Sequence, residues 1–299
     1  EGNGIHNAAA VVIDVATGSA VAWAGNCVLP DTTGRHGRDV DMVTAPRSTG
    51  SIMKPFLYAA LLSSGQLLPN ALIPDIPTRF QGFRPENADF TYSGAVPAGD
   101  ALARSLNIPA VRMLQMYEEE RFLILLRQMG FTTFTKPASH YGLSLILGGG
   151  EATLLELAQA YAAMARSLTE NPNSQIANRQ SQILTPAAIW LTYEALRRVN
   201  RPETETGWQY FGGAPEVAWK TGTSFGFRDA WAIGTTPSHV VAVWAGNADG
   251  EGRPGLSGIA SAAPLLFDII RLLPPSASWF ARPEEGMTLA SLCAASGYR

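Results

Sequence analysis

Three short groups of residues in this chain combine a serine with a lysine or an amide. Ser51 and Lys54 stand three positions apart, Ser105 and Asn107 stand two apart, and Lys220 opens the run Lys220-Thr-Gly-Thr-Ser224. A serine hydroxyl is a strong nucleophile only when a base takes its proton, and a neutral lysine amine can be that base. Each group alone occurs by chance in many proteins. Their combination, in this order, predicts an active-serine acyl-transfer site.

Ser51 follows the turn-forming run Arg47-Ser-Thr-Gly50 and precedes an apolar stretch, so we expect it to open a helix. Free N–H groups at a helix N-terminus favour a developing oxyanion. Lys54 would lie one turn along on the same face. As a base it needs a pKa near 7 instead of about 10.4, a change of roughly 4–5 kcal/mol. Burial and the neighbouring charge of Lys220 would supply that change.

Each group also has an ordinary structural explanation. The first could be the exposed first turn of a helix, and the second a capping or loop pair before Pro109. The third could be an edge strand protected by its lysine. In that strand Gly222 would let a ligand approach the backbone, and Thr221 and Thr223 would place hydroxyls on one face. Because all three ordinary explanations would have to hold together, the catalytic interpretation is favoured.

Composition limits the other classes of function. With 299 residues, 46% of them hydrophobic, the chain can bury a large core as one domain or two. A net charge of −3 with 16% charged residues excludes a basic surface for nucleic acid. No apolar run approaches the ~20 residues that span a bilayer. Cys27 and Cys293 stand outside any zinc-binding pattern, and we expect Cys27 to be a buried thiol.

The order of the periodic segments predicts an α/β (α+β) fold. Its five-stranded, mainly antiparallel sheet would be flanked by helices, and a helical insertion would carry both serine groups. Strand patterns occupy residues 8–15, 19–24, 217–223, 229–234 and 239–245. Helical patterns occupy residues 51–65, 98–105, 118–129, 152–164, 187–199 and 260–272. Residues 69–94 are rich in Pro and Asn, and we expect them to wrap the surface.

Other candidate motifs are weaker. The four histidines stand in unrelated contexts, and no G-x-S-x-G elbow occurs. The run 148–150 consists of three glycines, but no G-K-[ST] follows it, so we interpret it as a turn before a helix starting near Glu151. Arg228 and Asp229 are interpreted as an ion pair or a loop anchor.

The segments around these groups resemble the transpeptidase domain of class A, bifunctional penicillin-binding proteins. Residues 219–231, followed by 243–247, are most similar to the 1C type, and the resemblance extends from residue 8 to residue 272. It implies the fold shared by penicillin-binding proteins and β-lactamases. It also implies a D,D-transpeptidase that cross-links peptidoglycan stem peptides ending in D-Ala-D-Ala and that binds β-lactam antibiotics.

The resemblance assigns roles residue by residue. Ser51 would be the nucleophile and Lys54 its general base. Ser105 would relay a proton to the leaving D-Ala amine, and Asn107 would hold Lys54 and the substrate amide. Lys220 would tune the electrostatic field of the site.

A second set of residues would bind substrate. Thr221 and Thr223 would hold the terminal carboxylate, with Gly222 and Ser224 beside them. The N–H groups of Ser51 and Thr223 would form the oxyanion hole. No metal or organic cofactor is implied.

The resemblance also bears on the surroundings of the domain. It places a transpeptidase domain at 1–275 and a linker at 276–299 toward a C-terminal domain, with a glycosyltransferase domain and a membrane anchor before it. We expect the domain at the periplasmic face of the bacterial inner membrane. The alternatives are a D,D-carboxypeptidase, a non-catalytic penicillin-binding sensor, and a β-lactamase using Glu151, Glu156 or Glu170 to activate water.

Overall fold

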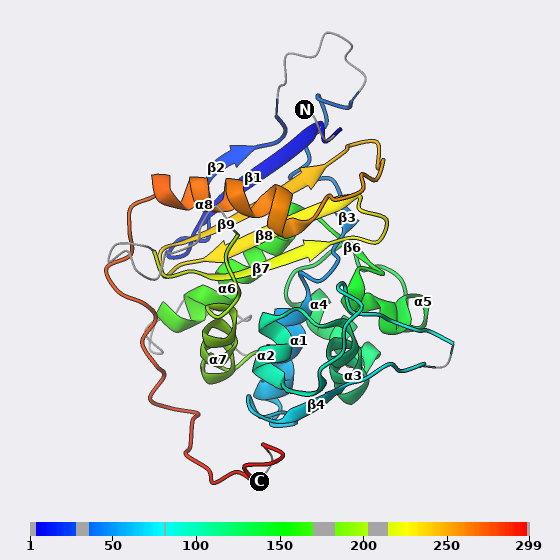
Figure 1. Ribbon diagram of the computed structural model, residues 1–299. Helices are drawn as coiled ribbons and strands as arrows, with labels where there is room; N and C mark the ends of the chain where they lie inside the picture. Colours follow the sequence, from blue (N-terminus) through cyan, green and yellow to red (C-terminus); the bar gives the residue numbers. More distant parts are fainter. Residues whose placement is uncertain (1–3, 28–35, 81, 170–182, 203–214, 298–299) are drawn as a thin grey trace.

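A computed structural model describes residues 4–27, 36–80, 82–169, 183–202 and 215–297. Its centre is a five-stranded sheet with the order β2-β1-β9-β8-β7, in which every neighbouring pair is antiparallel (Figure 1). The strands are β1 (Asn7–Asp14), β2 (Ala20–Ala24), β7 (Ala218–Thr223), β8 (Asp229–Thr235) and β9 (His239–Gly246). The predicted sheet is therefore confirmed, and its two halves come from opposite ends of the chain.

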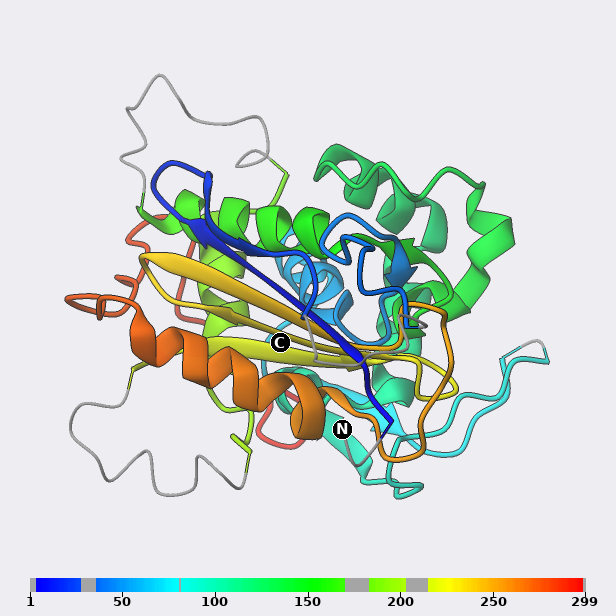
Figure 2. The same ribbon diagram turned by 90° about the horizontal axis from the view of Figure 1, so that it is seen from above.

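The central strands are apolar on both faces because both faces are covered. Helix α6 (Leu154–Thr169) packs on one face, and the short π-helix η5 (Gly258–Ala262) with α8 (Ala263–Leu272) packs on the other (Figure 2). Successive residues of a strand point to opposite faces. Accordingly, Trp231 and Trp244 belong to the core on the α6 side, whereas Trp219 belongs to the core beneath α8.

The region between the two halves of the sheet is mostly helical. Its helices are α1 (Lys54–Ser63), α2 (Ala98–Ala103), α3 (Asn107–Tyr117), α4 (Glu119–Gln128), α5 (Ala138–Tyr141), η1 (Gly142–Leu147) and α7 (Pro186–Leu196). Two small sheets pair β3 (Arg47–Ser48) with β6 (Glu151–Ala152), and β4 (Leu72–Asp75) with β5 (Gly94–Pro97). Helix α1 is buried from Lys54 through Leu61, so it forms the core of this region.

Several expectations need correction. Helix α1 begins at Lys54 and not at Ser51, which lies in a turn before it, because Pro55 fits the first helical turn. Helix α3 was not expected, because Pro109 follows Ser105 and Asn107 closely and suggested a loop or the end of a preceding helix. Pro109 lies instead in the first turn of α3, where the N–H groups need no partner within the helix. Residues 69–94 do more than wrap the surface, because they include β4 and the buried Asn87.

Two further local features differ from expectation. The glycine run 148–150 leads into strand β6, and α6 begins only at Leu154. Cys27 is half-buried and not fully buried, and its Sγ donates to the carbonyl oxygen of His6 at 3.3 Å.

The chain after α8 runs along the outside of the helical region (Figure 1). Trp279 donates from Nε1 to Glu194 at 2.8 Å, and the ring of Phe280 lies against that of Tyr193. Near the end, the Ser296 carbonyl oxygen accepts from the N–H of Leu72. No helix among the described residues is both long enough and apolar enough to cross a membrane.

Candidate active site

Lys54 is a fully buried lysine at the start of α1. Its Nζ donates to the carbonyl oxygens of Ser105 (2.8 Å) and Leu106 (3.2 Å) and to Oδ1 of Asn107 (2.7 Å). Burial lowers the pKa of Lys54 well below its ordinary 10.5, and the charge of Lys220 lowers it further. The three oxygens favour the ammonium form, but burial and the second cation outweigh them.

Lys220 lies on β7, which is an edge strand of the sheet as predicted. It is also buried, and its Nζ donates to Oγ of Ser105 at 2.7 Å and to the carbonyl oxygen of Thr221 at 2.6 Å. Burial lowers the pKa of Lys220 from 10.5 to about 7. The structure thus brings the second and third sequence groups into direct contact.

Ser105 sits between the two lysines in a left-handed conformation, with φ of +58°. It occupies the position just after the C-cap of α2, where glycine is usual. Its N–H donates to the Leu102 carbonyl and the N–H of Leu106 donates to that of Ala101, which is the hydrogen-bond pattern of a Schellman motif. Leu106 and Ala101 also share a small apolar cluster. This helix ending therefore holds a strained serine where both lysines reach it.

The turn that carries Ser51 packs directly against β7. A Cβ on Gly50 would lie 2.6 Å from the carbonyl oxygen of Thr223, and a Cβ on Gly222 would lie 2.9 Å from that of Thr49. Gly222 therefore permits a close approach by the chain's own turn, a role that the sequence did not indicate. Ser51 is half-buried, and the described residues offer its hydroxyl no hydrogen-bond partner.

Two aromatic side chains from distant elements hold this turn in place. The hydroxyl of Tyr161 on α6 donates to the carbonyl oxygen of Ile52 at 2.9 Å. Nε1 of Trp231 on β8 donates to the carbonyl oxygen of Ser48 at 2.8 Å. The turn around Ser51 is thus fixed from both sides, although its sequence alone gave no indication of either partner.

The remaining residues of the β7 segment divide into two kinds. Oγ1 of Thr223 accepts from the N–H of Gly258 at 3.0 Å, which leaves its own proton free to donate, and Thr221 is half-buried on the same strand face. Ser224 is buried, and its hydroxyl donates to the Asp229 carboxylate and accepts from the Asp229 N–H. Ser224 therefore closes the β7–β8 hairpin, with Asp229 as its loop anchor.

The serine turn, the two buried lysines and the shared second serine all lie within a part of the chain that matches a known family. Residues 8–271 match the penicillin binding protein transpeptidase domain. The chain belongs to this family.

Individual relatives agree with the assignment of this penicillin-binding protein domain to the class A, 1C type. The chain is 37% identical to penicillin-binding protein 1C of Escherichia coli over 89% of its own length and 34% of the relative's. It is 30% identical to penicillin-binding protein 1A of Neisseria meningitidis, over 88% of the chain and 35% of the relative. The chain thus spans about a third of the length of the curated relatives it matches.

Solved structures share the penicillin-binding protein fold. The PonA1 protein of Mycobacterium tuberculosis in complex with penicillin V has a TM-score of 0.73 at 22% identity, covering 95% of this chain and 83% of that one. Penicillin-binding protein 1A of Haemophilus influenzae has a TM-score of 0.70 at 21% identity, covering 95% and 49%. At these identities the likeness concerns the fold alone.

Of the carboxylates suggested for a β-lactamase, Glu156 is occupied at the start of a helix. Glu156 accepts from the N–H and hydroxyl groups of both Thr132 and Thr153, forming a capping box at the start of α6. Burial raises its pKa, but these hydrogen bonds outweigh burial and lower the pKa overall. Glu151 is exposed, and Glu170 lies outside the described residues.

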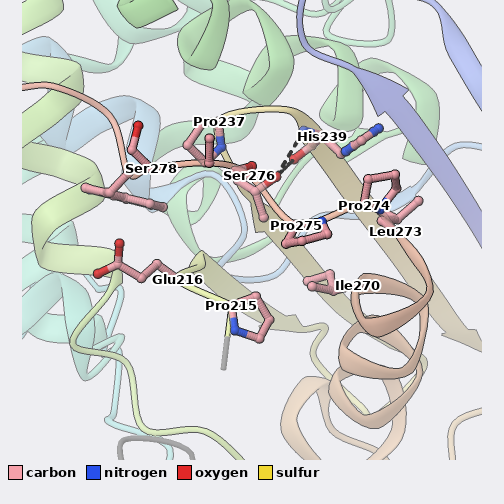
Figure 3. A pocket seen from close by; sticks show the side chains of 13 residues that line it. Pro215, Glu216, Pro237, His239, Ile270, Leu273, Pro274, Pro275, Ser276 and Ser278 are labelled. Atoms are coloured by element: carbon pink, nitrogen blue, oxygen red, sulfur yellow. Dashed lines mark hydrogen bonds between the residues drawn. The ribbon is translucent and has the colours of Figure 1, made fainter. Parts of the chain in front are cut away.

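Two cavities among the described residues lie away from the lysines. One of about 300 Å³ is lined by the β8–β9 turn, the end of α8 and residues 273–279, with the Thr236 hydroxyl bonded to the backbone of His239 at its edge (Figure 3). The other, of about 460 Å³, is lined by Tyr58, Arg198 and neighbouring residues. Neither cavity includes a residue of the three sequence groups.

Proposed function

We propose that the chain is the D,D-transpeptidase domain of a peptidoglycan cross-linking enzyme, acylated at Ser51 by D-Ala-D-Ala stem peptides and by β-lactams. The observation that carries this proposal is the pair of buried lysines, Lys54 and Lys220, held on two different oxygens of Ser105. A buried lysine of lowered pKa can take the proton of a serine near neutral pH.

Acylation begins when Ser51 Oγ attacks the carbonyl carbon between the two D-Ala residues and Lys54 takes its proton. Because free enzymes often hold their catalytic groups apart, we expect Ser51 to close on Lys54 when substrate binds. The oxyanion is stabilised by the N–H groups of Ser51 and Thr223. As the C–N bond breaks, Ser105 gives its hydroxyl proton to the leaving amine and receives in its place the proton that Lys54 took from Ser51, so that Ser105 relays one proton and both groups return to their starting states. The Oγ of Ser105 already accepts from Lys220, so its own proton is available.

Substrate recognition falls to the edge strand. The free edge of β7 offers backbone groups to an extended peptide, which would add as a further strand. The substrate's terminal carboxylate accepts from Thr223, whose hydroxyl oxygen is already occupied by Gly258, and from Thr221. The amine of a second stem peptide then attacks the acyl-enzyme, forming the cross-link and releasing Ser51.

The alternatives differ in what ends the acyl-enzyme. In a carboxypeptidase water replaces the amine, and in a β-lactamase a carboxylate activates that water. The capping role of Glu156 argues against the β-lactamase. A sensor would remain acylated by any substrate.

We propose further that the domain works at the periplasmic face of the inner membrane beside a glycosyltransferase domain, with a membrane anchor outside the present sequence. The support is the match to penicillin-binding protein 1C, of which the chain covers 34%.

Intact-mass spectrometry tests the proposal. The protein is incubated with a fluorescent penicillin, and separately with a donor peptide ending in D-Ala-D-Ala plus an acceptor amine. We expect one stable penicilloyl adduct, absent in Ser51→Ala, and a cross-linked peptide product. Donor hydrolysis alone would indicate a carboxypeptidase, rapid penicillin turnover a β-lactamase, and a stalled peptide adduct a sensor. Adduct formation by Ser51→Ala would contradict the proposal.

A further inference from the structure

We propose that Asn87 is a positioning residue for acyl transfer: it fixes Asn107, and through Asn107 the amine of Lys54, while Asp75 fixes Asn87. The inference rests on the proposed reaction at Ser51 and adds two residues to it. Both Asn87 and Asp75 come from the segment 69–94, which the sequence indicated to be a surface loop.

Asn107 is held at both ends by consecutive residues of this segment. Its Nδ2 donates to the carbonyl oxygen of Glu86 at 2.7 Å, and its N–H donates to Oδ1 of Asn87 at 2.9 Å. Because the amide nitrogen faces a carbonyl, the amide oxygen must face the other way, toward Nζ of Lys54 at 2.7 Å. The orientation that serves Lys54 is therefore set by residues 86 and 87.

Asn87 also supplies the cap that α3 lacks. The N-cap residue of α3 is Leu106, whose side chain cannot accept a hydrogen bond. Oδ1 of Asn87 takes its place, accepting from the N–H of Asn107 and lying 3.4 Å from that of Ile108. A side chain distant in sequence thus pins the first turn of α3, which is the turn that carries Asn107.

The orientation of Asn87 is fixed in turn by a buried carboxylate. Nδ2 of Asn87 donates to Oδ1 of Asp75 and to the carbonyl oxygen of Thr91, each at 2.8 Å. Oδ2 of Asp75 accepts from the N–H of Ser93 at 2.8 Å. Asn87 is 2% exposed and Asp75 is fully buried. A carboxylate accepts only, so it requires the amide nitrogen of Asn87 and leaves the amide oxygen to α3. The result is a continuous chain of hydrogen bonds from Asp75 to Lys54.

The first test replaces Asn87→Ala and measures the rate of acylation by a fluorescent penicillin per folded molecule from pH 5 to pH 10. We expect the rate at pH 7 to fall at least tenfold. The part of the rate–pH profile that rises as Lys54 loses its proton should move to lower pH. The Lys54 ammonium would no longer have the Asn107 amide oxygen held in place beside it, so the pKa of Lys54 should fall. Hydrogen exchange over residues 105–112 should speed up at least tenfold.

The matched control is Asp89→Ala in the same loop. The Asp89 carboxylate accepts from the N–H and hydroxyl of Thr91, at 3.0 Å and 2.7 Å, and contacts nothing on α3. Asp89→Ala removes hydrogen bonds within the loop and none to α3, so we expect the acylation rate, its pH profile and the exchange of residues 105–112 to stay within twofold of the unmodified protein.

A second test exchanges the two partners. Asn87→Asp alone sets two carboxylates against each other, and we expect acylation to slow at least tenfold. Adding Asp75→Asn places an amide donor opposite the new carboxylate, so the double variant should be acylated at least three times faster than Asn87→Asp alone. In the double variant the carboxylate is at position 87, which is closer to Lys54 along the chain of hydrogen bonds than position 75. It should raise the pKa of Lys54, so the rise of the acylation rate with pH should lie at higher pH than in the unmodified protein.

The outcomes separate the inference from the proposed function. If the protein is labelled at Ser51 but Asn87→Ala keeps the original rate and pH profile, the positioning role is wrong. The positioning role would also be contradicted if the double variant, Asn87→Asp with Asp75→Asn, were acylated no faster than Asn87→Asp alone. This comparison serves as the test if Asn87→Ala does not fold. If penicillin never labels Ser51, the proposed function fails, and hydrogen exchange alone still decides whether Asn87 holds Asn107.

Discussion

Lys54 and Lys220 lie on two sides of one residue, with the Lys54 amine on the carbonyl oxygen of Ser105 and the Lys220 amine on its hydroxyl. They start 166 positions apart in sequence, on α1 and on β7. Both amines are buried where a positive charge is poorly solvated, and the charge of Lys220 also lowers the pKa of Lys54. The two lysines should therefore titrate as a pair.

Removing one cation should raise the pKa of the other. In Lys220→Met we expect the acylation rate at pH 7 to fall at least tenfold, with the pH limb moving to higher pH, because Lys54 becomes easier to protonate. Stopped-flow measurement with a fluorescent penicillin across pH 5–10 checks this. The third lysine of the chain, Lys136, is exposed, so Lys136→Met is the control and should behave like the unmodified protein. A limb that moves to lower pH in Lys220→Met would contradict the coupling.

The same burial should make stability depend on pH. The folded state holds Lys220 with a pKa of about 7, whereas the unfolded chain keeps the ordinary 10.5. Between these values the unfolded state binds more protons, so the unfolding free energy should rise with pH from about 7 to 10.5, and below about 7 the full penalty applies. That penalty is on the order of 5 kcal/mol. Denaturant unfolding of Lys220→Met should show a flatter rise; an unchanged slope would show that this lysine is not the cause.

The contact between Gly50 and β7 predicts a paired result. Gly50→Ala meets both a positive φ of +53° and the Thr223 carbonyl 2.6 Å from the new Cβ. Gly65→Ala has φ of +70° with nothing within 4 Å, so it shares only the strain. We expect Gly65→Ala to lower the unfolding free energy by about 1 kcal/mol and leave acylation unchanged. Gly50→Ala should lower it further and slow acylation at least tenfold. Equal effects of the two variants would mean that the turn tolerates displacement from β7.

The capping role of Glu156 predicts a stability effect without a catalytic one. Glu156→Gln should lower the unfolding free energy by about 1 kcal/mol, because weaker acceptors replace the carboxylate at Thr132 and Thr153. The lifetime of the penicilloyl-enzyme, followed by loss of fluorescence, should not change. A markedly longer lifetime would instead identify Glu156 as a base for hydrolysis.

The segment after α8 should contribute to stability. Phe280 is 6% exposed against α7, so Phe280→Ala should lower the unfolding free energy by about 3 kcal/mol. Leu289 is 95% exposed, and Leu289→Ala should change it by less than about 0.5 kcal/mol. If Phe280→Ala has no effect on thermal unfolding, the predicted domain end at residue 275 would stand; a loss of stability would move it past residue 280.

Sequence patterns predicted the sheet because its strands are short β-rich apolar runs bounded by turn residues, and that pattern depends only on neighbouring residues. They also picked out the three groups that the structure brings together, since a serine three residues before a lysine is visible in a single string. The start of α1 was misjudged because a turn and a first helical turn have similar sequence requirements, and only the hydrogen bonds at Ser51 distinguish them.

What the sequence could not predict are contacts made across long separations. Ser105 ends α2 in a conformation usually reserved for glycine, and nothing in the local string indicates this. Asn87 resembles any loop asparagine until its partners on β4 and α3 are known. The hydrogen bonds between Ser224 and Asp229 join residues on either side of a turn, and the lysine motif that precedes Ser224 gives no sign of them.

The pairing of β1 with β9, which aligns Asn7 with Gly246, also has a consequence for how the protein is made. Contacts between such distant segments form late and slowly during folding, because a long loop must close first. A growing chain presents Ser51 and Lys54 first, whereas Lys220 follows Lys54 by 166 residues and Thr223 comes three residues later. On the proposed mechanism, Ser51 should therefore be inert until β7 has docked beside its turn, and covalent labelling by penicillin would count only molecules in which the two halves of the sheet have joined.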